Sequence, residues 1–367
     1  MGMTANKPGV CTTIQDLGRT GFLGSGFSPS GCMDKRAAII ANLLVDNDPN
    51  APVLEFCLAG PTLRFTTATF IAVTGGDFRP TLDGVPLPAY TALPVKRGSV
   101  LSFSAPRAGV YGYLALAGGG PKIERVMGSA STNLKCGIGG WKGRALTTGD
   151  YLSFETRSTE FIPNLASHTL EGEASYYEFD SEEVRLRVVA GPQQDMFTQA
   201  GIEAFYGSPY QVSTQCDRMG FRLDGPVVET VSGSDIVSDG IALGAVQVPN
   251  HGRPIIMLAD RQTTGGYAKI GTIASVDIPK LVQSPPGRTV RFDPVSVQEA
   301  QELYRRETLH FKALAKMVRR PSYGGISPRK TARRLTPILE AQALASGGQA
   351  LWIETEETAH HREKRQS

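Results

Sequence analysis

Short apolar runs separated by glycine, proline and aspartate recur along most of the chain. Such runs, rich in β-branched and aromatic residues, predict short strands joined by turns. In the first half, strands are predicted at residues 11–16, 53–58, 62–65, 69–73, 81–82, 100–103 and 110–117. Asp83-Gly84 lies directly after one of these runs and predicts a hairpin turn. The pattern favours a mostly β first half that ends near Phe154.

Apolar residues also recur at helical spacing in a few places. Residues 33–45 have one apolar face, and the turn formers that follow predict the end of this helix. A second helix is predicted over about residues 193–206, and a third from Ser296 onward. Residues 335–345 predict a small additional helix.

A second series of short strands opens at Val184. The strands predicted in it occupy residues 184–190, 236–237, 245–248, 255–258, 272–276 and 289–292. Both halves place an early helix among short strands, so we expect two related, closed or nearly closed β-barrels, with few helices. The predicted organisation is a first β-barrel domain (1–155), a linker (156–183), a second barrel domain (184–294), a helix (295–318) and a basic, partly disordered tail (319–367).

Composition narrows the class of protein. The 41 Gly and 24 Pro favour turn-rich β structure over a helical bundle. A net charge of +3, without interleaved basic and aromatic residues, argues against a nucleic-acid partner. No apolar stretch is long enough to span a membrane. The five cysteines are dispersed without CxxC spacing, which favours reduced thiols in a cytoplasmic protein over a zinc site or a disulfide framework.

The segment with the most varied polar side chains follows an apolar run that ends at Ala259. Residues 260–269 combine an acid, a guanidinium, an amide, two hydroxyls, two glycines, a phenol and an amine. Loops on rigid sheets are where functional sites concentrate, and the paired glycines allow close backbone approach. A structural alternative is a turn at a barrel rim, in which Asp260 and Arg261 form an ion pair.

Further acidic and basic groups occur in turn-rich motifs at residues 15–19, 31–34, 216–220 and 238–240. Such groups suit reactions in which negative charge develops on oxygen. The predicted catalytic residues are Asp217, Arg218, Asp239, Asp260, Arg261 and Lys269. The predicted substrate-binding residues are Gln247, Gln262, Thr263, Thr264, Gly265, Gly266 and Tyr267. We expect these residues to converge on one cleft of the second domain, whereas Asp16, Asp34 and Asp48 have turn formation and helix capping as an alternative. No metal ligand is assigned.

Several long motifs, in the same order, resemble the biotin-dependent carboxyltransferase-like family. That family includes the C subunit of 5-oxoprolinase, allophanate hydrolase subunit 2 and the matching half of the urea carboxylase carboxyltransferase domain. The motifs that carry the resemblance are residues 12–19, 31–34, 60–63, 217–223, 238–241 and 260–270. The resemblance runs from about Lys7 to Val295, and the residues before Lys7 are not expected to make the family's first strand.

The resemblance implies tandem cyclophilin-like β-barrel domains and one component of an ATP-dependent 5-oxoprolinase. Such a component opens a cyclic amide together with a partner like the B subunit of that enzyme, and possibly a lactam-hydrolase A subunit, using ATP and Mg²⁺. One alternative is the carboxyltransferase component of a biotin-dependent urea or amide carboxylase, with biotin on a separate carrier and none attached to this chain. Another is a regulatory protein that binds a histidine-kinase inhibitor.

Overall fold

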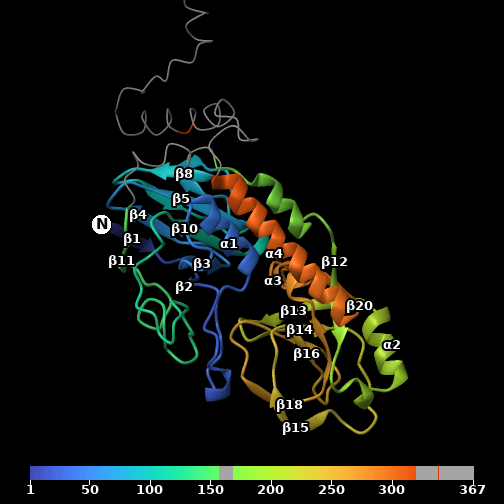
Figure 1. Cartoon of the computed structure of the whole chain (residues 1–367). Helices are drawn as coiled ribbons and strands as arrows, with labels where there is room; N and C mark the ends of the chain where they lie inside the picture. The colour runs from blue at the N-terminus through green and yellow to red at the C-terminus, as the bar shows by residue number, and fades with distance from the viewer. Residues whose placement is uncertain (157–167, 320–337, 339–367) are drawn as a thin grey trace, which may run out of the picture.

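The computed structural model describes residues 1–156, 168–319 and 338 (Figure 1). The described part is mostly β, as predicted, with a few helices. The predicted helix at 335–345 and the basic tail lie outside the described residues, apart from residues 319 and 338. No described helix has the length and apolar character needed to cross a membrane.

Two sheets packed face to face form the first half. The six-stranded sheet has the order β11-β1-β4-β9-β6-β7. Its strands are β1 (Gly2–Lys7), β4 (Thr62–Phe65), β6 (Thr81–Leu82), β7 (Val85–Pro86), β9 (Val100–Ser102) and β11 (Tyr151–Ser153). The five-stranded sheet has the order β2-β3-β10-β5-β8. Its strands are β2 (Cys11–Gln15), β3 (Val53–Cys57), β5 (Thr69–Asp77), β8 (Ala92–Val95) and β10 (Ala108–Leu116).

The first strand corrects one expectation. Residues before Lys7 do form a strand, because β1 pairs with both β4 and β11 and places Met3 and Ala5 in the core between the two sheets. Side chains alternate along a strand, so two apolar residues two positions apart are enough to bury one face. The predicted hairpin at Asp83-Gly84 is confirmed, since it joins β6 to β7.

A closed barrel of seven strands forms the second half, in the order β12-β19-β16-β17-β14-β13-β20. Its strands are β12 (Glu183–Ala190), β13 (Tyr210–Cys216), β14 (Gly220–Asp224), β16 (Ala245–Gln247), β17 (Ile255–Met257), β19 (Lys269–Ile273) and β20 (Thr289–Val295). The pairing of β12 with β20 is parallel and closes the barrel. A two-stranded ribbon, β15 (Asp235–Gly240) with β18 (Thr264–Tyr267), lies at the end of the barrel (Figure 1).

Helices α1, α2 and α4 lie where the apolar spacing predicted helices, with one interruption, whereas α3 was not predicted. The α-helices are α1 (Lys35–Leu44), α2 (Gln199–Gly207), α3 (Ile278–Val282) and α4 (Val297–Arg319). The 3-10 turns are η1 (Leu23–Ser25), η4 (Glu171–Tyr177), η5 (Gln194–Met196) and η6 (Ser275–Asp277). The helix predicted at 193–206 is broken because Thr198 has an extended backbone, and its side chain accepts from the Gly201 N–H at 3.0 Å as the cap of α2.

The interval that was predicted as a linker is partly structural. Within η4, Tyr177 is buried in the core that also contains residues of both halves. Glu173 of the same turn binds Arg36 of α1 at 2.5 Å, and Glu307 of α4 binds Arg36 at 3.2 Å. The Arg36 guanidinium also lies 4.0 Å from the centre of the Tyr176 ring. Helix α4 therefore packs back onto α1, and η4 joins the two halves.

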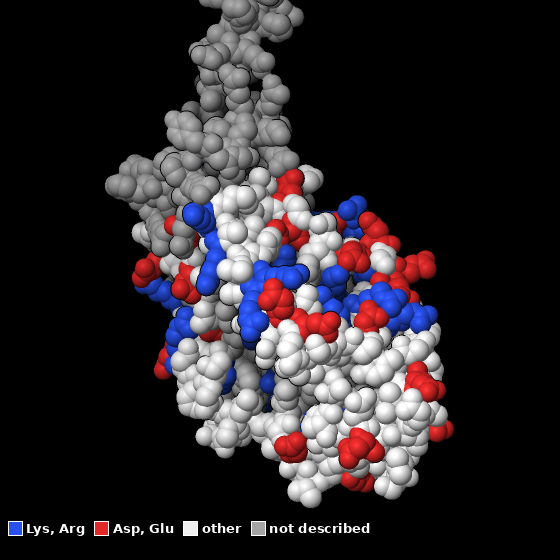
Figure 2. Space-filling model, turned by 45° about the vertical axis from the view of Figure 1, so that its right-hand side comes forward, with Lys and Arg blue, Asp and Glu red and all other residues white. Residues whose placement is uncertain are grey.

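Charge is unevenly distributed over one face of the molecule. Figure 2 shows Lys, Arg, Asp and Glu side chains gathered across the middle of this face, whereas the barrel in the lower part carries few of them. Several apolar side chains on the barrel are exposed, among them Val231 at 67% and Val237 at 93%. This face of the barrel therefore carries few charged groups, and the barrel also exposes apolar side chains.

Candidate functional site

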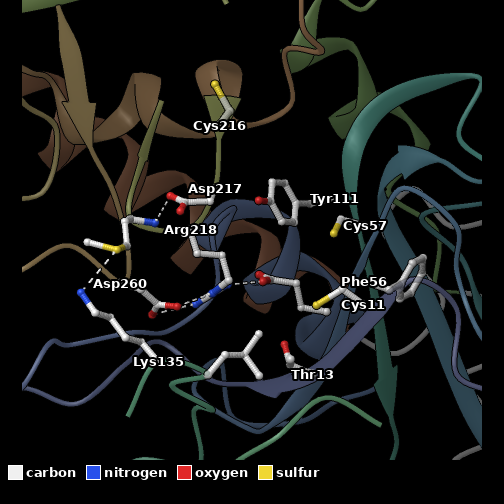
Figure 3. A pocket seen from close by; sticks show the side chains of 13 residues that line it. Cys11, Thr13, Phe56, Cys57, Tyr111, Lys135, Cys216, Asp217, Arg218 and Asp260 are labelled. Atoms are coloured by element: carbon white, nitrogen blue, oxygen red, sulfur yellow. Dashed lines mark hydrogen bonds and ion pairs between the residues drawn. The ribbon is translucent and has the colours of Figure 1, made fainter. Parts of the chain in front are cut away.

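A pocket of about 460 Å³ lies where the two halves meet (Figure 3). One wall comes from strands β2, β3 and β10 of the first half. The facing wall comes from the turn at residues 216–219, between β13 and β14, and from Asp260. Leu134 and Lys135 complete the lining.

The wall from the first half is one face of the five-stranded sheet. Cys11 and Thr13 of β2 lie directly opposite Cys57 and Glu55 of β3. Tyr111 of β10 lies opposite Cys57 on the other side. Residues two positions apart on a strand share a face, so this part of the sheet presents thiol, hydroxyl, carboxyl and phenol groups to the pocket.

Arg218 connects the two walls. Its Nε donates to Asp260 Oδ2 at 2.7 Å, and its Nη2 donates to the Gly31 carbonyl oxygen at 2.7 Å. Its Nη1 donates to Glu55 Oε1. A guanidinium has five N–H donors, and these contacts occupy most of them. Arg218 therefore holds the first half against the barrel, with little capacity left for a ligand.

Glu55 is a buried carboxylate that sequence reasoning missed. Its Oε2 accepts from the Tyr113 hydroxyl at 2.7 Å and from the Met33 N–H at 2.8 Å. Burial raises the pKa of Glu55, and the charge of Arg218 opposes that rise. Burial would likewise lower the pKa of Arg218, but the Glu55 and Asp260 carboxylates raise it well above the ordinary value. The sequence feature that could have identified Glu55 is its position as a lone acidic residue inside the apolar run Val53–Cys57.

Asp217 and Asp260 lie in the same pocket with different roles. Asp217 is exposed, and its Oδ1 accepts from the Met219 N–H at 2.8 Å and the Gly220 N–H at 3.1 Å, which fixes the turn before β14. Asp260 is buried and pairs with Arg218. The alternative in which Asp260 pairs with Arg261 is therefore wrong, because the next residue in the chain turns its side chain away from Asp260.

Arg261 is buried without a carboxylate partner in the described part of the chain. Its Nε donates to the Ile241 carbonyl at 2.9 Å, and its Nη1 donates to the Leu258 carbonyl at 3.1 Å. Burial lowers its pKa, with no acidic group opposing the shift. Carbonyl oxygens orient the guanidinium but do not neutralise its charge, so this position suits an anion.

Lys35 is a second cation near Arg261, and it was not among the predicted site residues. Burial is the main cause that lowers the pKa of Lys35, and the Arg261 charge acts in the same direction. No ion pair joins Lys35 to a carboxylate of the residues that the structure describes. It is the first residue of α1, where the helix dipole also favours negative charge. Its position directly after the motif at 31–34 was the available signal.

Lys269 and Gln247 form a pair of buried donors in the barrel. They are cross-strand partners on β19 and β16, and both side chains are almost wholly buried. Lys269 Nζ lies 3.1 Å from Asp239 Oδ2, and an ammonium has three N–H donors. Neither Lys269 Nζ nor Gln247 Nε2 has a properly oriented hydrogen-bond acceptor among the described residues.

Gly265 makes room beside these donors. It lies opposite Asp239 in the ribbon of β15 and β18. A Cβ atom on Gly265 would come within 2.8 Å of Gln247 Nε2 and 2.7 Å of Ile241 Cδ1, which is closer than real Cβ contacts allow. The missing side chain therefore keeps the space next to Gln247 open.

The remaining predicted substrate-binding residues belong to the ribbon or lie next to it. Gln262, Thr264 and Tyr267 are exposed, whereas Thr263 and Gly266 are half-buried. Thr264 pairs with Gly240 in the ribbon, so the segment expected to be a loop is partly a strand. This pairing fixes the backbone on both sides of Gly265.

The predicted residues form two groups rather than one open cleft. Asp217, Arg218 and Asp260 lie at the pocket between the halves. The other group gathers around the Asp239–Ile241 segment, and it contains Asp239, Gln247, Arg261, Gly265 and Lys269. The consecutive residues Asp260 and Arg261 connect the groups, because their side chains turn in different directions.

No cluster of three or more His, Cys, Asp or Glu in the described ranges could hold a metal ion. Asp217 and Asp239 are exposed carboxylates that each offer at most one or two oxygens. That donor set fits Mg²⁺ only when most of its ligands come from water and from phosphate groups.

Most of the chain matches one known protein family. Residues 25–294 match the family model described as carboxyltransferase domain, subdomain A and B. The chain belongs to this carboxyltransferase-domain family. The match covers Lys35, Arg261, the pocket lining apart from Cys11 and Thr13, and the whole barrel except the last residue of β20.

Two curated relatives match over nearly their full length. The chain is 39% identical over 310 residues to the C subunit of 5-oxoprolinase from Escherichia coli, which covers 84% of this chain and 96% of that protein. It is 34% identical over 306 residues to the C subunit of 5-oxoprolinase from Haemophilus influenzae, covering 83% and 95%. It is 32% identical to urea amidolyase of Saccharomyces cerevisiae, of which it covers 17%.

Solved structures show the same fold within longer chains. The urea amidolyase of K. lactis superposes with a TM-score of 0.77 at 30% identity, over 85% of this chain and 20% of that one. The urea carboxylase of Kluyveromyces lactis gives a TM-score of 0.77 at 29% identity, over 85% and 29%. The chain thus spans less than a third of these longer proteins.

Proposed function

We propose that this chain is one component of an ATP-dependent 5-oxoprolinase, a hydrolase of cyclic amides that works with partner subunits in the cytoplasm. The observation that carries the proposal is the 39% identity to the C subunit of 5-oxoprolinase from Escherichia coli over 84% of this chain and 96% of that protein. The urea amidolyase match is weaker and covers only 17% of its relative.

A lactam resists hydrolysis because its amide carbon is a poor electrophile. In the proposed reaction the lactam oxygen attacks the γ-phosphorus of ATP, and ADP leaves. One water then adds to the carbon and the ring C–N bond breaks, while a second water releases phosphate. Each step places negative charge on oxygen, which fixed cations and N–H donors stabilise when they are already oriented.

The buried donors of the barrel suit that charge. Gln247 Nε2 has no acceptor among the described residues, and Lys269 Nζ has N–H donors left beside its ion pair with Asp239. Gly265 leaves space beside Gln247. Arg261 and Lys35 add two cations that form no ion pair with a carboxylate of the described residues. We assign Lys269 and Gln247 to the oxygen of the amide substrate, and Arg261 with Lys35 to the phosphoryl group.

Mg²⁺ enters the proposal with ATP. The exposed carboxylate of Asp239, which lies in the same group as Lys269 and Arg261, would hold it together with phosphate oxygens and water. The ion would neutralise phosphate charge during transfer. Asp239 also forms the ion pair with Lys269 at 3.1 Å, so it would hold that ammonium in place at the same time.

Partner proteins are part of the proposal, because a C-type subunit works beside other subunits. The exposed apolar side chains of the barrel support it, since Val231 and Val237 would be covered by a B-type subunit. A lactam-hydrolase A subunit would complete the enzyme.

Carboxyl transfer to urea or another amide is the second candidate. It is favoured by the family to which the chain belongs and by the TM-score of 0.77 to the urea carboxylase of Kluyveromyces lactis. Carboxybiotin on a separate carrier would supply the carboxyl group, and the same cations would stabilise the anionic transition state.

Reconstitution separates these candidates. The chain is co-expressed with the A- and B-type subunits of the same source, and ADP release is measured with and without 5-oxoproline. We expect 5-oxoproline-dependent ADP, phosphate and glutamate. Activity that requires urea, bicarbonate and a biotin carboxylase would instead support the second candidate function, carboxyl transfer. A stable complex without any substrate-dependent ATP hydrolysis would instead favour a regulatory role.

A further inference from the structure

Two cysteines in the pocket form a pair that the proposed chemistry does not use. Cys11 and Cys57 are direct cross-strand partners on β2 and β3, and both line the pocket as half-buried side chains. Figure 3 shows both sulfur atoms on the same side of the pocket. Directly opposed residues of antiparallel strands have Cα atoms about 4.5–5.5 Å apart, which lies within the range that a disulfide requires.

We infer that Cys11 and Cys57 are a reactive dithiol site that a hydroperoxide oxidises reversibly to a disulfide across the pocket wall. The Cys11 thiolate attacks one peroxide oxygen, the O–O bond breaks, and Cys11 becomes a sulfenic acid while an alcohol or water leaves. Cys57 then attacks the Cys11 sulfur, and its proton leaves with the sulfenic hydroxide as water. The two thiols lose two electrons, and the hydroperoxide gains them.

The surroundings make Cys11 the attacking thiol. A hydrogen bond from Cys57 is the largest influence and lowers the pKa of Cys11 to about 7, although burial opposes it. The same interaction raises the pKa of Cys57, which therefore stays protonated as the donor. Arg218, held in the facing wall, also favours the Cys11 thiolate. A low-pKa thiol beside a resolving thiol is the arrangement of a redox-sensitive site.

The other cysteines provide internal comparisons. Cys216 lines the same pocket from β13, but its thiol donates to the Arg222 carbonyl at 3.7 Å and burial raises its pKa to about 11. Cys32 is fully buried, and burial raises its pKa well above the ordinary value. Cys136 is exposed and lies outside the pocket lining. Oxidation should therefore select Cys11 and Cys57 among the five thiols.

The lowered pKa of Cys11 has two opposing effects on the rate at which this thiol reacts with a hydroperoxide. A lower pKa increases the fraction of Cys11 that is thiolate at pH 7. It also weakens the thiolate as a nucleophile, but by less than it increases the thiolate fraction. Cys11 should therefore react faster at pH 7 than Cys216, whose pKa is raised.

The test uses the full chain, reduced and then treated with one equivalent of hydrogen peroxide at pH 7. Remaining thiols are alkylated with iodoacetamide in denaturant, so that buried thiols also react, and peptides are mapped by mass spectrometry without reduction. We expect a Cys11–Cys57 linked peptide that dithiothreitol reverses, with Cys32, Cys136 and Cys216 alkylated. In Cys57→Ser the reaction should stop at a sulfenic acid on Cys11, detectable with dimedone. The control Cys136→Ser should form the bridge at the unchanged rate.

Several outcomes would overturn the inference. One is a disulfide between Cys11 and Cys216. Another is preferential oxidation of Cys136, and a third is alkylation of Cys11 and Cys57 at full yield after peroxide. Failure of the 5-oxoproline assay would leave this result unaffected, since the readout is the mass of the peptides.

Discussion

Lys269 and Gln247 face each other across β19 and β16. Gln247 Nε2 is buried without an acceptor in the described chain, and Lys269 Nζ is buried beside it with an ion pair to Asp239 at 3.1 Å that lacks hydrogen-bond geometry. An unsatisfied buried donor costs about 1–3 kcal/mol of stability, more when it is charged. A protein keeps such a cost where a ligand offsets it. This pair is therefore the feature of the barrel that points most directly to a bound oxygen atom.

Replacing Lys269 by Met should separate function from stability. Met keeps most of the apolar stem and removes the buried charge. We expect the substrate-dependent rate of the assembled enzyme to fall by about 10²-fold or more, as for other single electrostatic contacts in active sites. The melting temperature should stay the same or rise slightly. Lys122→Met, which removes an exposed lysine paired with Glu155 at 3.0 Å, is the matched control and should change neither quantity.

The two neighbouring glycines of the ribbon provide a steric test. Gly265→Ala would place a methyl group 2.8 Å from Gln247 Nε2, whereas the nearest atom to a Cβ on Gly266 is 3.5 Å away. We expect Gly265→Ala to raise KM or lower kcat by about tenfold, the effect of losing about 1.4 kcal/mol. Gly266→Ala should behave like the unmodified protein. Equal effects of the two substitutions would show that the space beside Gln247 is not used.

Arg218→Met should destabilise the protein strongly, because it leaves Glu55 and Asp260 buried without their cation. Breaking a buried ion pair costs about 3–5 kcal/mol. The double variant Arg218→Met/Glu55→Gln should recover part of that loss in denaturant unfolding. Arg253→Met breaks only an exposed pair with Asp224, so it should cost less than about 1 kcal/mol. A double variant no more stable than the single one would contradict the pairing.

Asp34 should make stability depend on pH. Burial raises the pKa of Asp34 from 3.8 to about 6 in the folded protein, although it accepts from Ala37 N–H and Gln283. Between about pH 4 and pH 6 the folded state therefore binds more protons than the unfolded state. The free energy of unfolding should fall as the pH rises through that window, by up to about 3 kcal/mol from this group.

Asp34→Asn keeps an oxygen that can cap α1 and removes the titration. The difference in unfolding free energy between the unmodified protein and this variant should decrease from pH 4 to pH 7. If the difference in unfolding free energy between the unmodified protein and Asp34→Asn stayed constant with pH, the Asp34 carboxyl group would titrate in the folded protein as it does in the unfolded chain.

The sequence predicted those parts of the fold where one local pattern dominates. Helix α1 followed from its apolar face, and the Asp83-Gly84 hairpin followed from turn chemistry. Strand β1 was missed because only Met3 and Ala5 reveal its buried face, and the break before α2 was missed because apolar spacing continues across Thr198. Tertiary pairing with β15 turned part of the expected loop at 260–269 into a strand.

The candidate site was predictable in composition but not in arrangement. The sequence motifs identified Arg218, Asp260 and Lys269 as candidate site residues. No local sequence pattern predicts that Arg218 contacts Glu55, which lies 163 residues away in sequence. Glu55 itself sits in a strand that the sequence describes as core. Which charged groups share a pocket depends on how the two halves pack, and a single sequence does not encode that in any short pattern.

The parallel pairing of β12 with β20 has a consequence for synthesis of the chain. The barrel is not closed until β20 pairs with β12, and the paired residues Glu183 and Thr289 lie 106 positions apart in sequence. While the ribosome is still producing the intervening segment, β12 and β13 expose unpaired strand edges, which are prone to adhere to other chains. The second half should thus depend on chaperone protection until residue 295 emerges, and a chain truncated before β20 should accumulate as aggregate rather than as a shorter soluble domain.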